Sequence, residues 1–169
     1  ILHNNYLVDF HLYPKNAASM DLRGEDISIR HYEALREKLP RCEILWDVPF
    51  QDGKLSSDTT EITVSTLSEE DVTALAYFPD LETLNGENCT DYDCLLKARE
   101  CYPDVTVSYR VTLDGTAYPD SADTVELRTA DAQTLERLPF LTQLRTVTAG
   151  GSDQPQDFSE LSRYCQEKG

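Results

Sequence analysis

Trp46-Asp47-Val48-Pro49-Phe50, followed by a turn at Asp52-Gly53 and by Thr60-Glu61-Ile62-Thr63-Val64, is the stretch that decides the fold of this chain. The same order of residue types returns over Tyr109–Leu127. A more divergent copy, Tyr6–Leu22, opens the chain. Repetition of this kind is typical of proteins built from stacked units, so we interpret the chain first as a repeat protein.

The copies are separated by related distances. The middle copy, which begins at Trp46, and the last copy, which begins at Tyr109, are offset by 63 residues, and the first copy precedes the middle one by 40. Strands are expected with centres near residues 22, 44, 64, 84, 107, 127 and 146. A spacing of about 19–23 residues corresponds to one coil of a solenoid with one strand per coil. We therefore predict a single repeat domain over residues 1–169, with about seven coils.

Helix signals occur between several of these strands. Apolar residues at 32, 35 and 39 predict a helix over residues 31–39, which Pro40 ends. Ser68, Asp91 and Asp131 are predicted to cap the next three helices, and a last helix is expected within residues 157–169. Asp114-Gly115, between two alternating segments, predicts a β-hairpin.

One segment joins this period to a known motif. Leu81-Glu82-Thr83-Leu84-Asn85-Gly86-Glu87-Asn88-Cys89 resembles the leucine-rich-repeat core L-x-x-L-x-L-x-x-N/C, although Gly86 stands where the third leucine belongs. Residues 75–81 and 135–144 are similar to the family's lead-in to the strand. The resemblance covers most of residues 20–151 and points to an atypical, degenerate bacterial-type member. It implies a right-handed α/β solenoid with one parallel β-sheet on one face and helices and extended loops on the other.

Composition limits the partners. The formal net charge of −16 would repel the phosphate backbone of a nucleic acid, so nucleic acid is not an expected partner. No apolar run is long enough to cross a bilayer, so we expect no membrane insertion of this segment. Because the chain begins at Ile1 inside a repeat, we expect a fragment of a secreted or surface-attached bacterial protein whose N-terminal signal or anchor has been removed.

The five cysteines do not form a recognisable framework; they are Cys42, Cys89, Cys94, Cys101 and Cys165. An odd count without paired C-x-x-C spacing fits neither a zinc site nor a complete set of disulfides. Buried thiols are the favoured interpretation, because three of the five occupy positions where the repeat requires a small apolar residue. A Cys89–Cys94 or Cys94–Cys101 disulfide remains an alternative.

The sequence offers no set of catalytic residues. The three histidines are scattered, and no nucleophile elbow, phosphate-binding loop or zinc-protease motif occurs. Two aspartate groups could ligate calcium, namely Asp91 with Asp93, and Asp114 with Asp120 and Asp123. Neither has the twelve-residue loop that ends in a bidentate glutamate, so capping and turn roles are preferred. We predict no catalytic residue, no metal site and no cofactor, and we do not expect an enzyme.

Polar side chains flanking the strands are predicted to form a concave binding face. Its predicted members are Arg23, Glu43, Thr63, Ser65, Thr83, Asn85, Thr106, Ser108, Glu126, Arg128 and Arg145, with Asp21 and Thr146 beside them. The expected function is non-catalytic binding of a protein, peptide or glycan on this face or on the hairpin loops around Gly53 and Gly115. The alternative is a structural spacer that positions another domain of the full-length protein.

Aromatic residues occupy one equivalent position in each copy, at Tyr6, Trp46 and Tyr109. Packing against the loop that follows each strand is the simpler interpretation. A row of exposed rings that binds a glycan is the functional alternative, and it requires these side chains to be accessible.

Overall fold

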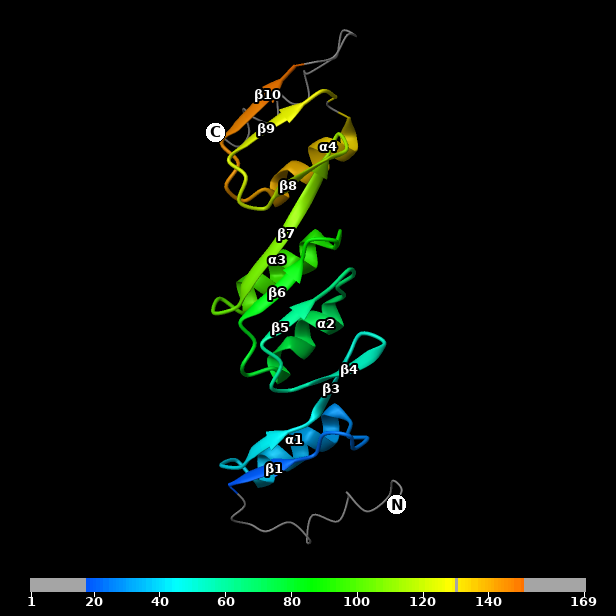
Figure 1. Ribbon diagram of the computed structural model, residues 1–169, viewed down its shortest axis with the longest axis vertical. Helices are drawn as coiled ribbons and strands as arrows, with labels where there is room; N and C mark the ends of the chain where they lie inside the picture. The colour runs from blue at the N-terminus through cyan, green and yellow to red at the C-terminus, as the bar shows by residue number, and fades with distance from the viewer. Residues whose placement is uncertain (1–17, 130, 151–169) are drawn as a thin grey trace. The chain divides into compact units, whose positions relative to one another are not determined.

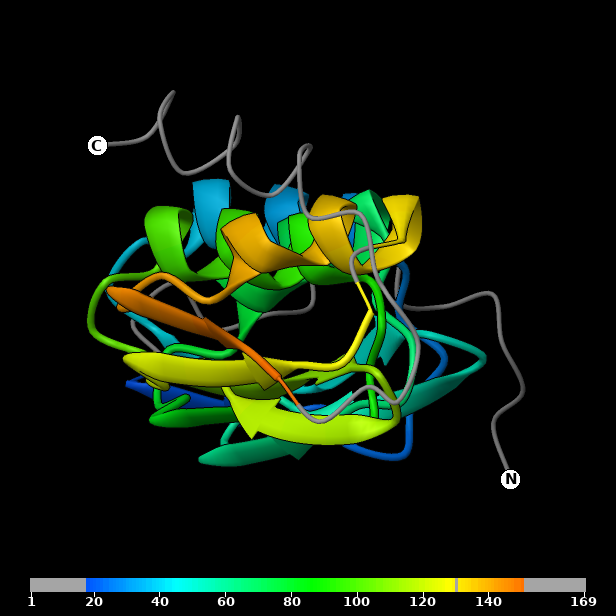
Figure 2. The same cartoon turned by 90° about the horizontal axis from the view of Figure 1, so that it is seen from above.

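The computed structural model describes residues 18–129 and 131–150, and contacts within the chain divide it into two compact units (Figure 1). Of the described residues, unit 1 comprises 18–62 and 68–82, and unit 2 comprises 63–67, 83–129 and 131–150. Within each unit taken by itself, the helices lie on one side of the strands (Figure 2).

Unit 1 contains a parallel strand pair, a hairpin and two short helical segments. Its elements are β1 (Ser19–Asp21), α1 (Ile29–Lys38), β2 (Glu43–Leu45), β3 (Asp47–Phe50), β4 (Gly53–Ser56), most of β5 (Glu61–Thr63), α2 (Glu69–Ala74) and the 3₁₀ helix η2 (Leu75–Tyr77). β1 pairs in parallel with β2, from Ser19 opposite Glu43 to Asp21 opposite Leu45. β3 and β4 form an antiparallel hairpin in which Phe50 lies opposite Gly53.

Unit 2 repeats this plan with a longer strand before its hairpin. Its elements are β6 (Thr83–Gly86), α3 (Tyr92–Cys101), β7 (Thr106–Leu113), β8 (Thr116–Pro119), β9 (Thr124–Leu127), α4 (Ala132–Arg137), the 3₁₀ helix η3 (Leu138–Phe140) and β10 (Thr146–Ala149). β6 pairs in parallel with the first half of β7, and the second half of β7 forms an antiparallel hairpin with β8. β9 pairs in parallel with β10.

The prediction of one parallel sheet in a right-handed solenoid is wrong. The described strands form three two-stranded sheets, β1-β2, β3-β4 and β10-β9, and one four-stranded sheet in the order β5-β6-β7-β8. Parallel and antiparallel pairs are mixed, because a β-hairpin follows β2 and another is formed by β7 and β8. The Ser57 N–H donates to the Trp46 carbonyl, and the Asp120 N–H donates to the Tyr109 carbonyl. In a continuous parallel sheet, the Trp46 and Tyr109 carbonyls would accept hydrogen bonds from the next strand. Here each of them accepts a hydrogen bond from the end of its own hairpin instead.

Turn and cap chemistry explains where these elements begin. The two-residue turn Asp114-Gly115 has positive φ at both residues, 49° and 78°, as the mirror-image hairpin turn requires. The predicted hairpin is therefore confirmed at this position. In the middle copy the turn lies at Gln51-Asp52, one residue earlier than predicted, and Gln51 has a φ of 50°.

Two of the predicted helix caps are confirmed. Ser68 caps α2 in a capping box with Asp71, and Asp131 accepts a hydrogen bond from the Thr134 N–H at the start of α4. Asp91 precedes α3 but makes no side-chain cap, because its carboxylate accepts the Leu67 N–H at 2.8 Å.

Aspartate carboxylates join successive loops inside each unit. In unit 1, Asp47 accepts the Gly24 N–H at 2.6 Å and Asp71 accepts the Gln51 N–H at 3.1 Å. Asp91 makes the equivalent contact in unit 2. These loops contain backbone N–H groups that no strand ladder satisfies, and an ionised carboxylate is a strong acceptor for them. Part of the acidic composition is therefore structural.

Each unit has an apolar core between its helices and strands. In unit 1 the fully buried core side chains include Trp46 and Val48 at 0% exposure. Trp46 stacks on Tyr32 with a ring separation of 4.3 Å and meets the edge of Tyr77 at 5.8 Å. In unit 2 the fully buried core side chains include Leu84 and Leu95, both at 0% exposure.

Candidate functional site

The predicted concave-face residues lie at exposed or half-exposed positions on or beside the strands. They are divided between the two units: Arg23 and Glu43 are in unit 1, and the remaining nine are in unit 2. Register brings two pairs together in unit 2, Thr83 beside Thr106 and Asn85 beside Ser108. Because the strands form separate sheets, the uninterrupted face expected from a single parallel sheet is not formed.

Arg23 is already engaged by its own unit. Its guanidinium donates to Asp21 at 2.6 Å and to Asp58 at 3.1 Å. Hydrogen bonds from Arg23 lower the pKa of Asp21 to about 2. Both partners are exposed, so the ion pair contributes little to stability, but it leaves Arg23 already bound to a carboxylate.

The hairpin loop at Asp114 is also held by internal contacts. The Asp114 carboxylate accepts the backbone N–H groups of Arg128 at 2.7 Å and Thr129 at 3.0 Å, and it accepts the Thr129 hydroxyl. Burial raises the pKa of this carboxyl, but the hydrogen bonds from Thr129 and Arg128 outweigh it and hold the pKa below its usual value. This loop is fastened to the strand end after β9, which explains its acidic residue without a ligand.

The aromatic positions do not form an exposed row. Trp46 is 0% and Tyr109 is 1% exposed, so the interpretation as core residues is confirmed for both. Tyr6 lies outside the described residues. Burial raises the pKa of Tyr109, whose hydroxyl donates to the Phe140 carbonyl at 2.7 Å. A glycan-binding row built on Trp46 and Tyr109 is therefore wrong.

None of the four cysteines among the described residues forms a disulfide. Cys42 and Cys89 are buried, as predicted, whereas Cys94 is half-buried and Cys101 is exposed. Cys165 lies outside the described residues.

The aspartates considered as calcium ligands have separate structural roles. Asp91 and Asp114 bind backbone N–H groups, and Asp120 pairs with Arg99. Within the part of the chain that the structure describes, no group of three or more His, Cys, Asp or Glu side chains could hold a metal ion.

The clearest candidate site emerges when the middle and last copies are compared at their 63-residue offset. In the last copy, the Arg99 guanidinium donates to the Val107 carbonyl at 2.6 Å and to the Asp120 carboxylate at 2.5 Å. It also lies over the Tyr109 ring, 5.1 Å from the centroid. These contacts cover the edge of β7 that faces away from β6.

The next strand of the last copy is closed in a similar way. The Tyr118 hydroxyl donates to the Glu126 carbonyl at 3.0 Å and accepts the Glu126 N–H at 3.2 Å. Glu126 is on β9, and its backbone groups face away from β10 because the neighbouring residues of β9 make the ladder. Side chains therefore satisfy the Val107 carbonyl and both backbone groups of Glu126 in the last copy.

The middle copy leaves the corresponding edge open. In the β1–β2 ladder, the Glu43 N–H donates to Ala18 and the Leu45 carbonyl accepts from Leu22. The alternation of a parallel ladder then directs the N–H and C=O of Ile44 to the opposite edge of β2. Among the described residues, no hydrogen bond reaches the Ile44 backbone groups on that side.

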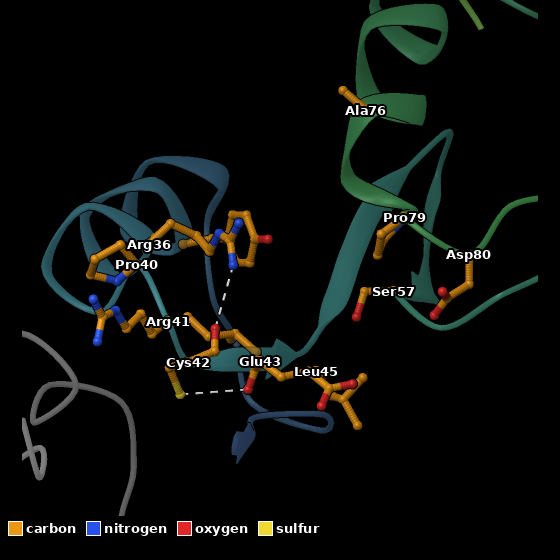
Figure 3. A pocket seen from close by; sticks show the side chains of 12 residues that line it. Arg36, Pro40, Arg41, Cys42, Glu43, Leu45, Ser57, Ala76, Pro79 and Asp80 are labelled. Atoms are coloured by element: carbon orange, nitrogen blue, oxygen red, sulfur yellow. Dashed lines mark hydrogen bonds between the residues drawn. The ribbon is translucent and has the colours of Figure 1, made fainter. Parts of the chain in front are cut away.

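An open cavity of about 440 Å³ lies along this edge, and we call it the β2 slot (Figure 3). One wall consists of Pro40–Leu45 with Tyr32 and Arg36 from α1, and the opposite wall consists of Ser57, Ala76, Pro79 and Asp80. All of these residues belong to unit 1. A cavity of this size lies within the range of about 300–1,000 Å³ that is usual for small ligands.

Two arginines give the slot its charge. Arg36 donates to the Cys42 carbonyl at 3.4 Å, and Arg41 also lines the cavity. Over the described residues, neither guanidinium has a carboxylate within ion-pair distance. Glu43 and Asp80 line the slot as well, so it contains both signs of charge.

Two buried polar atoms nearby are also unsatisfied. Trp46 Nε1 and Ser56 Oγ have no hydrogen-bond partner among the described residues. Trp46 directly follows β2, and Ser56 directly precedes Ser57 of the slot wall. Unsatisfied buried polar groups are uncommon in folded proteins, and here two of them belong to residues next to the slot.

Sequence reasoning missed the slot apart from Glu43, which was predicted as part of the concave face. The available signal was the 63-residue offset, which aligns Arg36 with Arg99 but Ser57 with Asp120. At this offset the arginine is common to both copies, whereas the carboxylate that Arg99 binds has no counterpart at Ser57.

Comparison with known proteins assigns no family to the chain. No protein-family model, no curated protein and no solved structure matches it significantly. None of the helices in the described ranges 18–129 and 131–150 is long and apolar enough to cross a membrane.

Proposed function

We propose that this chain is a non-catalytic binding module that holds an extended peptide segment of a protein partner in the β2 slot. The observation that carries the proposal is that the N–H and C=O of Ile44 have no hydrogen-bond partner among the described residues and lie at an open cavity of about 440 Å³. An extended peptide binds such an edge by adding a strand, with main-chain hydrogen bonds supplying affinity.

The length of the bound segment follows from the groups at each end of the edge. The Cys42 carbonyl accepts from Arg36, and the Trp46 N–H donates to the Ser57 hydroxyl at 3.1 Å. Ile44 alone therefore offers an unused donor and acceptor between two occupied ends. The proposed ligand is a short extended segment that makes two main-chain hydrogen bonds to Ile44 and places its side chains toward the slot walls.

Substitution of Ile44 tests the main-chain contact. Ile44→Pro removes the N–H that would donate to the peptide, and the parallel ladder with β1 does not use that N–H. Ile44→Val keeps the N–H and trims one methylene from the side chain, so it is the matched control. We expect peptides captured on an array of extended hexapeptides to bind Ile44→Val and to lose at least tenfold in affinity for Ile44→Pro. Equal binding to both variants would contradict the proposal.

A second pair of variants covers the case in which Ile44→Pro does not fold. Ala76 is exposed and lines the slot, so Ala76→Trp places a large side chain in the cavity. Thr73 is exposed on α2 and is not part of the slot, so Thr73→Trp adds the same group elsewhere. We expect Ala76→Trp to abolish peptide capture and Thr73→Trp to leave it unchanged. Capture by both tryptophan variants would refute the β2 slot as the binding site.

A further inference from the structure

The last copy shows which chemical group is missing from the β2 slot. Arg36 and Arg99 occupy equivalent positions at the 63-residue offset, on α1 and α3. Each guanidinium donates to a carbonyl in the segment that follows its helix: Arg36 to Cys42, directly before β2, and Arg99 to Val107 in β7. Only Arg99 also binds a carboxylate, that of Asp120.

Ser57 stands at the position equivalent to Asp120. The backbone there is the same in both copies, since Ser57 donates its N–H to Trp46 at 2.8 Å and Asp120 donates its N–H to Tyr109 at 3.0 Å. The Ser57 residue is 2% exposed, and its hydroxyl accepts the Trp46 N–H. The middle copy thus keeps the arginine and the backbone but lacks the carboxylate.

Two arginines without a carboxylate partner are unexpected in a chain with so many acidic residues. The sequence has 31 acidic residues and 15 basic ones. Even so, Arg36 and Arg41 line one cavity and have no carboxylate within ion-pair distance among the described residues. The planar guanidinium fork matches a carboxylate in geometry and charge.

We infer that the β2 slot recognises an aspartate or glutamate side chain of the bound peptide, with Arg36 as the main contact and Arg41 beside it. The ligand carboxylate takes the place that Asp120 fills in the last copy. This inference rests on the proposed function, because it requires a peptide in the slot. Glu43 and Asp80 limit the slot to one such group, since further acidic side chains would meet like charges.

The test uses acetylated, C-terminally amidated hexapeptides with a Val-Thr background that carry one Glu, one Gln or neither. A second set carries Gln with a free C-terminal carboxylate. Binding to the full chain is measured by fluorescence anisotropy at low and high salt. We expect the Glu peptide to bind about tenfold or more tightly than the Gln peptide, as expected for a hydrogen bond between charged groups, with a smaller ratio at high salt.

Two variants test the assignment of the carboxylate to Arg36. Arg36→Gln should abolish the preference for Glu over Gln, whereas the matched Arg99→Gln in the last copy should leave the preference intact. Ser57→Asp should supply the carboxylate internally and remove the preference while the neutral peptide still binds. If Ser57→Asp does not fold, the exposed position of Arg36 keeps the test available through Arg36→Gln.

The outcomes separate the two proposals. Binding of Glu and Gln peptides with equal affinity, lost in Ile44→Pro, would overturn the carboxylate inference and retain the peptide-binding function. Preference for the free C-terminal carboxylate over the Glu side chain would overturn the side-chain assignment. Absence of binding by every peptide would overturn the proposed function itself.

Discussion

Gly86 offers the sharpest test of packing in unit 2, because its side-chain position is already occupied. A Cβ added at Gly86 would lie 2.6 Å from Cδ2 of Leu95, whereas ordinary contact begins at 3.4 Å. The Leu95 methyl would have to move by at least 0.8 Å, the difference between these distances. Leu95 is 0% exposed, so its side chain has little room to move. Overpacking of this kind costs about 1–3 kcal/mol.

A second term acts in the opposite direction. Glycine within a strand is entropically unfavourable, and alanine recovers about 0.5–1 kcal/mol. Gly86 does not need a left-handed backbone, so this gain is available to alanine. From the midpoints of these two ranges, about 2 kcal/mol lost and about 0.75 kcal/mol recovered, we expect Gly86→Ala to lower the free energy of unfolding of the native chain by about 1 kcal/mol.

Shortening Leu95 should reverse the sign of this effect. Leu95→Ala alone should cost about 2–5 kcal/mol by leaving a cavity. In that background the methyl group added at position 86 no longer meets the leucine methyls and keeps only an ordinary contact of 3.4 Å with the Ser108 carbonyl oxygen. Gly86→Ala should then stabilise the chain by about 0.5–1 kcal/mol. Urea denaturation of the four chains, followed by circular dichroism, completes the double-mutant cycle. Additive effects, or a Gly86→Ala change within about 0.3 kcal/mol of zero in the native background, would refute the packing argument.

Three further predictions follow from contacts in the described residues. Arg99→Ala should lower the free energy of unfolding by about 2–3 kcal/mol, because it leaves the Val107 carbonyl and the Asp120 carboxylate unpaired. Arg36→Ala should lower it by less than about 1 kcal/mol, because Arg36 binds only the Cys42 carbonyl. Equal losses for the two variants in thermal or urea unfolding would contradict this difference between the copies. The pKa of Asp114 is lower in the folded chain than in the unfolded chain. Its contribution to the free energy of unfolding is therefore present above the unfolded pKa of about 3.9 and is lost as pH falls through the folded pKa. Asp114→Asn should flatten the acid side of a plot of stability against pH, and an unchanged slope would contradict this role of Asp114. Iodoacetamide should modify exposed Cys101 well before buried Cys89, because burial shields the Cys89 thiol and raises its pKa. Peptide mass spectrometry of the folded chain measures the two rates, and equal rates would show that Cys89 is not protected.

Local chemistry made several elements predictable from sequence. Ser68 and Asp131 precede helices because a short polar side chain satisfies backbone N–H groups of the first turn. Asp114-Gly115 specifies a hairpin because both residues tolerate positive φ. Each of these signals acts within a few residues, so the sequence window contains the whole cause.

Sheet continuity was not predictable in the same way. The apolar alternation around Ile44 and Val107 predicts strands but does not state which edge of a strand pairs with which neighbour. That choice depends on backbone groups thirteen residues further along, where Ser57 and Asp120 bond back to Trp46 and Tyr109. Periodicity alone therefore favoured one continuous parallel sheet, and the hairpins interrupt it.

The two interruptions have the same origin but different consequences for function. A strand edge left open by a hairpin carries polar backbone groups, and a folded protein must cover or pair them. In the last copy, Arg99 and Tyr118 supply that cover from inside the chain. In the middle copy, Leu55 stands where Tyr118 would be, and a serine replaces Asp120, so the internal cover is absent. Because the same backbone plan folds with the cover in one copy and without it in the other, the cover is not required for the hairpin itself. The open edge at Ile44 leaves an N–H and a C=O to which a segment from outside the chain could pair, and this is the physical basis of the proposed peptide binding by unit 1.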